Sequence, residues 1–140
     1  MKKSKFQFIN PYLKEAAFKR NPNFIPDDTE FVMQNSFHVH VRRIGKENRA
    51  NVELELETNK KADDAPFQMH VRVASDFKWE DLDDDTVEKL LNSNAPALLL
   101  SYMRPIVANL TNASNLPVYN LPFVNFKAES DGQGIKICKI

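Results

Sequence analysis

The sequence has few of the residues on which redox chemistry, phosphate loops and membrane insertion depend. Its 140 residues include three glycines and a single cysteine, Cys138. One cysteine excludes an intrachain disulfide, and the glycines form no phosphate-binding motif. No segment reaches the roughly 18 consecutive apolar residues that a membrane-spanning helix requires. We therefore expect no cofactor and no direct insertion into a membrane.

The chain also lacks an excess of charge of either sign. Nineteen lysines and arginines balance nineteen aspartates and glutamates, so the formal net charge is zero. A neutral chain is not attracted in bulk to nucleic acid. Lys2, Lys3 and Lys5 form a basic start, but no apolar run of about 7–15 residues follows them, as it would in a secretory signal peptide. We expect a cytoplasmic protein that does not bind nucleic acid.

Strands are the clearest local signal. Apolar and polar residues alternate over 37–42, 52–57 and 67–73, with short polar turns between these stretches. That period of two and those short connections predict an antiparallel meander. The opening stretch 5–19 adds a fourth strand, which Pro11 confines to an edge, a bulge or a break. We predict an α+β fold in one domain, residues 1–140, with strands over about 5–79.

A short helix of about residues 85–92 is expected after the strands. Asp85, with Glu88 three residues later, matches a helix-capping pair. The run Asn92-Ser93-Asn94 should end this helix. The tail, 127–140, is polar apart from isoleucines that alternate as in a short strand or a frayed end.

A long helix is expected over about residues 96–113, with Pro96 in its first turn. Its apolar residues spread over more than one side of the helix. The sheet can cover one side, so we expect a second subunit to cover the other and the protein to oligomerise through its helices. The expected interface residues are Leu98, Leu99, Tyr102, Met103, Ile106 and Leu110.

The loop over residues 114–126 is rich in proline and apolar residues. Its rings either pack into the core or subunit interface, or line a groove beside the long helix. An exposed apolar groove is typical of polypeptide-binding surfaces, and extended chains can bind there with little sequence selectivity. The candidate groove residues are Tyr12, Phe18, Tyr102, Tyr119, Leu121, Phe123 and Phe126.

Three histidines are candidate metal ligands. His38 and His40 lie on one face of a strand, and His70 on another strand could complete the three protein ligands of a zinc site. The same residues alternate with core positions beside a glutamate-rich strand, so cross-strand ion pairs are the simpler interpretation. No established metal-ligand spacing is present. We expect ion pairs here and no metal.

The sequence contains no recognisable catalytic motif. Cys138 has no identifiable base beside it, and Ser101 does not stand in a nucleophile elbow. We therefore expect no catalytic residue and no enzymatic activity.

Several motifs together resemble the SecB family of protein-export chaperones. They are Ser101-Tyr102-Met103-Arg104, Leu110-Thr111 and 120–126 (NLPFVNF), with Phe6-Gln7-Phe8 and Tyr12 resembling the first strand of the family. The resemblance in order and spacing covers roughly residues 5–126. It implies a homotetramer built as a dimer of dimers. It also implies ATP-independent binding of unfolded precursor polypeptides, which are held for export and delivered to the SecA motor.

The chain departs from that family at the positions expected to face SecA. Acidic family positions on the first strand fall at Glu15 and at Lys19, where the charge is reversed. A reversed charge works against docking. Two alternatives therefore stand beside export: a dedicated SecB-like chaperone of one client, such as an antitoxin, and a non-catalytic structural interaction module.

Overall fold

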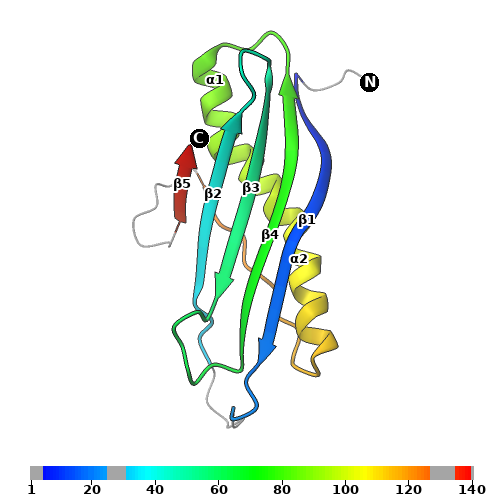
Figure 1. Cartoon of the computed structure of the whole chain (residues 1–140), viewed down its shortest axis with the longest axis vertical. Helices are drawn as coiled ribbons and strands as arrows, with labels where there is room; N and C mark the ends of the chain where they lie inside the picture. The colour runs from blue at the N-terminus through cyan, green and yellow to red at the C-terminus, as the bar shows by residue number, and fades with distance from the viewer. Residues whose placement is uncertain (1–4, 25–30, 127–134, 140) are drawn as a thin grey trace.

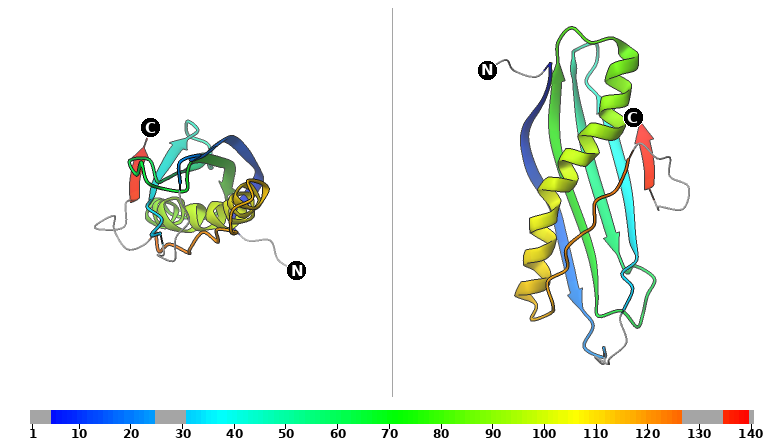
Figure 2. Two further views of the ribbon diagram at one scale, coloured as in Figure 1. Left: turned by 90° about the horizontal axis from the view of Figure 1, so that it is seen from below. Right: turned by 180° about the vertical axis from the view of Figure 1, so that it is seen from behind.

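The computed structural model describes residues 5–24, 31–126 and 135–139, in which one helix crosses one face of a long sheet (Figures 1 and 2). The strands are β1 (Phe6–Arg20), β2 (Asn35–Arg43), β3 (Arg49–Thr58), β4 (Phe67–Trp79) and β5 (Ile135–Lys139). Their spatial order is β1-β4-β3-β2-β5.

The antiparallel four-stranded sheet predicted from the alternation is confirmed. Strands β2, β3 and β4 form the meander, and β1 pairs antiparallel with β4 at one edge of the sheet. At the other edge β5 pairs parallel with β2, so the short-strand interpretation of the tail holds over residues 135–139. In the tight turn between β2 and β3, Gly45 adopts a left-handed backbone conformation (φ 52°).

An irregularity in β1 decides which of its side chains face the helix. Asn10 has a positive φ of 53° ahead of Pro11, and the register with β4 shifts between Ile9 and Tyr12. The Phe8 ring packs at a tilt against Phe77 (5.2 Å between centroids), on the side of the sheet that the helix covers. Beyond the bulge, Tyr12 pairs with Ala74, on the opposite face of the sheet.

The core lies between that covered face and helix α2 (Ala95–Ala113). Figure 2 shows α2 running diagonally across the sheet. Most inward-facing residues at the centre of this layer have no exposed surface; they include Val52, Leu54, Leu56, Val71, Val73, Leu99, Met103 and Val107. The alternation of the strands and the apolar stripe of the helix thus meet in one layer.

The expected break between the two helices is absent. Helix α1 (Asp84–Lys89) continues through a π-helical segment, η1 (Leu90–Asn94), into α2. Asn94 keeps helical dihedral angles and makes no capping hydrogen bond with its side chain, and the Ala95 N–H donates to the Leu90 carbonyl. The Ser93 hydroxyl donates to the Lys89 carbonyl (2.6 Å), so its polar group is satisfied within the continuous helix.

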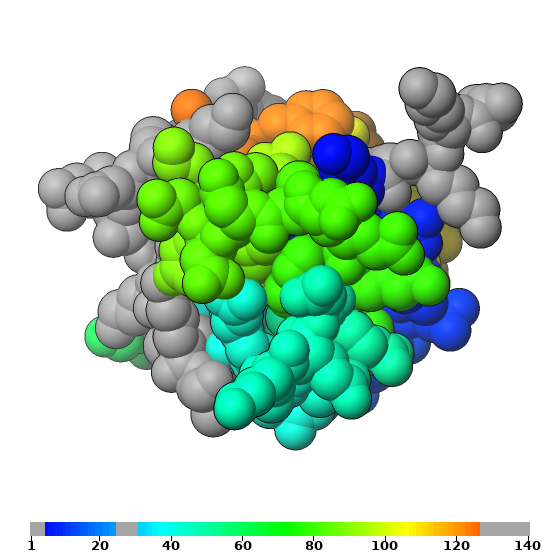
Figure 3. Space-filling view, turned by 90° about the horizontal axis from the view of Figure 1, so that it is seen from above, coloured from blue at the N-terminus to red at the C-terminus, as the bar shows by residue number. Residues whose placement is uncertain are grey.

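The cap of α1 is also different from the expected one. The side chain of Asp83, and not Asp85, accepts a hydrogen bond from the Thr86 N–H (2.7 Å). Seen end-on, α1 and the β2–β3 turn gather at one end of the molecule (Figure 3). At this end Arg43 of β2 contacts both β4 and α1. Its guanidinium lies over the Trp79 ring (5.3 Å) and forms an ion pair with Glu88.

No helix within the described ranges is long and apolar enough to cross a membrane.

Candidate functional site

The loop after α2, residues 114–126, returns along the helix towards β2 (Figure 2). Three hydrogen bonds position it. The Tyr119 N–H donates to Thr111 Oγ1 (2.9 Å), and Asn35 Nδ2 donates to the Tyr119 hydroxyl (2.6 Å). Arg104 Nε donates to the Leu121 carbonyl (2.7 Å). The loop is therefore held to both α2 and the start of β2.

The apolar side chains of this loop divide into two sets. Leu121 and Phe126 are buried, and the Phe126 ring packs edge-on against Phe37 of the core (6.1 Å between centroids). Phe123 points outward and is 71% exposed. The Arg104 guanidinium stacks on the Phe123 ring, 4.0 Å from its centroid. Arg104 thus fixes the loop backbone and orients its most exposed ring.

Two adjoining hollows lie along this loop. One, of about 480 Å³, opens between the start of α2 and the end of the loop; Phe6, Leu98, Ser101, Val124 and Phe126 are among its lining residues. The other, of about 250 Å³, lies over the start of β2 and is lined by Asn35, Phe37, Pro122, Phe123, Val124 and Asn125. Val124 and Asn125 line both hollows, so the two adjoin at the end of the loop; we refer to the pair as the groove, and its lining is partly apolar.

The structure brings only part of the expected groove together. Phe123 lies in it, and Tyr102 and Tyr119 are half-buried beside the core. Leu121 is fully buried in the core, so assigning it to an open groove was wrong: Arg104 holds its backbone carbonyl and its side chain faces inward. Phe126 packs against the core and also lines the hollow beside α2.

The two β1 residues proposed for the groove lie elsewhere. Tyr12 is on the opposite face of the sheet, because the bulge at Pro11 shifts the register. Phe18 stacks on Phe67 (5.0 Å) and lines a separate hollow of about 440 Å³ between β1 and the β3–β4 end of the sheet. Sequence reasoning missed Val124 and the role of Arg104, although both stand in the family-like motifs and could have been considered from them.

The outward side of α2 has no charged side chain. Its exposed residues include Ala97, Leu98, Ser101, Pro105 and Asn109, and the only charged residue of the helix, Arg104, is engaged with the loop. Leu98 is 43% exposed.

The expected interface residues of α2 divide by exposure. Tyr102, Ile106 and Leu110 are half-buried. Leu99 and Met103 are wholly buried against the sheet, so placing them at an interface with a second subunit was wrong. The inner stripe of the helix is already covered within one chain.

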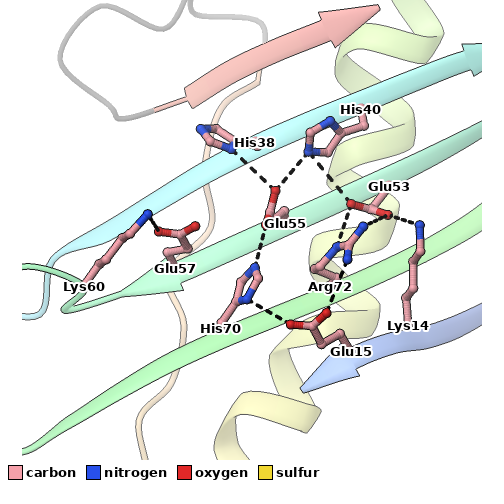
Figure 4. A network of polar contacts seen from close by, with 10 residues as sticks. All are labelled: Lys14, Glu15, His38, His40, Glu53, Glu55, Glu57, Lys60, His70 and Arg72. Atoms are coloured by element: carbon pink, nitrogen blue, oxygen red, sulfur yellow. Dashed lines mark hydrogen bonds and ion pairs between the residues drawn. The ribbon is translucent and has the colours of Figure 1, made fainter. Parts of the chain in front are cut away.

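The opposite face of the sheet carries a network of charged side chains (Figure 4). Glu53 is buried, and its carboxylate accepts hydrogen bonds from Lys14 Nζ (2.7 Å) and Arg72 Nε (3.0 Å). Burial would raise the pKa of Glu53, but the hydrogen bonds from Arg72 and Lys14 keep that pKa below its ordinary value. The cross-strand ion pairs expected from the alternation are present.

Glu15, the residue proposed to dock SecA, belongs to the same network. Its carboxylate lies 3.1 Å from His70 Nδ1 and 3.3 Å from Arg72 Nη1. An acidic side chain with a cationic partner in its own chain offers less attraction to a basic surface.

Glu55 gives this network a measurable pH dependence. Burial would raise its pKa, but hydrogen bonds from His40 and His70 lower it from 4.5 to about 2. Because the pKa is lower in the folded state, Glu55 contributes fully to stability above pH about 4.5 and loses this contribution as the pH falls towards about 2. We expect a loss on the order of 1–2 kcal/mol after solvent screening.

Urea unfolding at several pH values between about 5 and 2.5 measures this loss. The variant Glu55→Gln should lose less of its free energy of unfolding over that range than the parent protein. Equal losses in the two proteins would show that Glu55 is not the group responsible.

Comparisons with known proteins agree with this architecture. The family model described as preprotein translocase subunit SecB matches residues 1–129. The protein-export protein SecB of Idiomarina loihiensis is 39% identical over 72 residues, which are 51% of this chain and 43% of that protein. The protein of the same name from Stenotrophomonas maltophilia is 26% identical over 119 residues, 83% of this chain and 69% of that protein.

A solved structure shows the same fold. The SecB-like chaperone of Mycobacterium tuberculosis, in complex with a peptide from an antitoxin, superimposes with a TM-score of 0.66 at 13% identity, over 86% of this chain and 88% of that chain. The curated relatives are matched over less of their length, 43% in the first case. Since the family model covers nearly the whole sequence, the chain belongs to the SecB family.

Proposed function

We propose that the protein is a chaperone that binds unfolded or precursor polypeptides, without ATP, and holds them for protein export. The observation that carries this proposal is the groove beside the loop 114–126, where Phe123 is 71% exposed yet held in place by Arg104. An exposed aromatic ring that is fixed in orientation can bind apolar side chains at little cost in conformational entropy. Membership of the SecB family supports the same function.

The proposed mechanism requires no chemical step. An unfolded chain offers scattered apolar side chains and free backbone hydrogen-bonding groups, which a folded protein hides. The groove would take up the apolar side chains, and its open shape over Val124 would admit many sequences. A protein that binds only the unfolded form of its client shifts the client's folding equilibrium by mass action and limits its aggregation. The activity is thus non-enzymatic and is proposed to take place in the cytoplasm.

Self-association into a homotetramer, a dimer of dimers, is part of the proposal. The uncharged outer side of α2 is suited to burial, and it exposes Leu98 near its start, next to the groove. The 15-residue strand β1 stands at the edge of the sheet, and β4 is its only partner strand among the described residues. A long edge strand of this kind is usually paired or covered in a native assembly.

A dedicated chaperone of one client, such as an antitoxin, is the second candidate. It is favoured by the state of Glu15, which is paired with His70 and Arg72, and by the opposite charge of Lys19. Both weaken the case for delivery to SecA. The structural likeness to the mycobacterial chaperone rests on the fold and leaves the client of this chain open.

The groove is tested by binding of a fluorescently labelled, unstructured polypeptide, followed by fluorescence anisotropy. Phe123→Ser should raise the Kd by about 10- to 30-fold, as expected for the loss of an aromatic anchor. Val32→Ser is the matched control, because Val32 is a 77% exposed apolar residue outside the groove.

The two variants should unfold at the same temperature as the parent, since both side chains are exposed. An equal affinity of Phe123→Ser and Val32→Ser would overturn the assignment of the groove. Affinity for one client polypeptide alone, among several unrelated ones, would select the dedicated chaperone.

A further inference from the structure

Three imidazoles converge on one carboxylate on the uncovered face of the sheet (Figure 4). His40 Nε2 lies 3.0 Å and His38 Nδ1 lies 3.5 Å from the same oxygen, Glu55 Oε1. His70 Nε2 lies 2.5 Å from the other oxygen, Oε2. The register explains the convergence, because His38 and Glu55 are direct partners across β2 and β3.

The charges of this network leave Glu55 in an unusual position. The network in Figure 4 contains four carboxylates and three lysine or arginine side chains. The carboxylates are Glu15, Glu53, Glu55 and Glu57, and the cations are Lys14, Lys60 and Arg72. Lys14 and Arg72 bind Glu53, Arg72 also reaches Glu15, and Lys60 binds Glu57 (3.0 Å).

Glu55 is the remaining carboxylate. Among the described residues its hydrogen bonds and ion pairs go only to histidines. No lysine or arginine among the described residues forms an ion pair with Glu55; Arg72 attracts it only at longer range. A bound cation would compensate the charge of Glu55, and two imidazole nitrogens already lie beside the charged oxygen.

The geometry and the donor types suit a transition metal. Two imidazole nitrogens and one carboxylate oxygen form a donor set found in zinc enzymes. With bonds of about 2.0–2.1 Å, the ligand atoms of a tetrahedral zinc ion lie about 3.3 Å apart. The two nitrogen–oxygen separations, 3.0 and 3.5 Å, bracket that value. His38, His40 and Glu55 each offer one ligand atom, and these three atoms lie within 4.8 Å of one another, so small side-chain rotations would bring the two nitrogens into range.

We propose that His38 Nδ1, His40 Nε2 and Glu55 Oε1 form a binding site for a divalent transition-metal ion, with Zn²⁺ as the expected occupant. The side chains of His38 and His40 are 32% and 30% exposed, so an ion and a water ligand can reach them from solvent. His70 contacts the second oxygen of Glu55 and orients the carboxylate. In known metal sites, residues that hydrogen-bond a ligand orient it in the same way.

A second grouping, Glu55 with Glu57 and His70, is less suited to zinc. It offers a single imidazole, and Glu57 is already bound by Lys60. The two groupings predict different variants to be defective, so experiment can separate them.

Zinc binding is measured by isothermal titration calorimetry on untagged protein freed of metal with a chelator. Substitution by Co²⁺ reports the ligands through its visible absorption. We expect one Zn²⁺ per chain, and His38→Gln and His40→Gln should each weaken binding at least about 100-fold. His70→Gln should weaken it about 10-fold by freeing the Glu55 carboxylate.

A control excludes the second grouping. Glu57→Gln should leave the affinity for Zn²⁺ unchanged, and circular dichroism should show that every variant is folded. The proposal is overturned if the parent protein shows no saturable binding at millimolar Zn²⁺, or if binding survives both His38→Gln and His40→Gln.

Discussion

The substitution Leu98→Asp should separate the subunits of the proposed oligomer while each chain stays folded. Leu98 is 43% exposed on the uncharged outer side of α2, so the aspartate would be solvated in the free chain. In an interface between identical helices the new carboxylate would be buried, at a cost of several kcal/mol. Symmetry places it there twice. We expect the dissociation constant of the subunits to rise by more than about 100-fold.

Multi-angle light scattering at micromolar concentration measures this effect. Val32→Asp is the matched control, because it adds the same charge to another exposed apolar position, which is remote from α2 in the sequence. Its mass should equal that of the parent. A parent protein that is a strict monomer at this concentration would contradict the proposed use of the outer side of α2.

The substitution Leu99→Ala, one residue further along, should have the opposite effect. Leu99 is 0% exposed and packs with Met103 against the sheet. Its truncation removes buried apolar surface and leaves a cavity, which typically costs about 2–5 kcal/mol. For a chain of this size we expect Tm to fall by roughly 6–15 °C.

Thermal unfolding followed by circular dichroism measures the change in Tm. Parent and variant are compared at one protein concentration, because the Tm of an oligomer depends on it. At low temperature the mass of Leu99→Ala should equal that of the parent. A loss of less than about 1 kcal/mol, or dissociation of a folded chain, would show that Leu99 does not face the sheet as described.

The contrast between Leu98 and Leu99 shows which features of α2 could be predicted from the sequence and which could not. Periodicity predicted that α2 is apolar on more than one side, but both residues belonged to that broad surface. Only the direction in which α2 crosses the sheet decides that Leu99 points inward. That direction depends on packing between distant parts of the chain, which a local pattern does not contain.

Local preference also failed at the join between the two helices. Asparagine and serine favour helix ends, so the run 92–94 was expected to end the first helix. Leu91 and Ala95 on either side of this run are buried, and their packing keeps the backbone helical through η1. The predicted meander succeeded because the alternation of each strand matches its burial, as at Val39 and Leu54.

The loop 114–126 could be recognised but not divided into core and groove. Its proline-rich sequence has no period, so nothing local tells that Leu121 faces inward while Phe123 faces outward. The loop backbone at Leu121 is held by Arg104, which lies 17 residues earlier in the chain. The three histidines could be recognised as candidate ligands from the sequence. Their distances from Glu55 could not, because these depend on the register between two strands.

The central claim, that this chain holds unfolded polypeptides, is tested most directly by refolding. A slow-folding precursor protein is diluted from denaturant with and without this protein, in the absence of nucleotide, and its refolding is followed by fluorescence. We predict that an equimolar amount of assembled chaperone slows refolding several-fold and that Phe123→Ser restores most of the rate. Unchanged refolding of every precursor tested, even with excess protein, would contradict the claim.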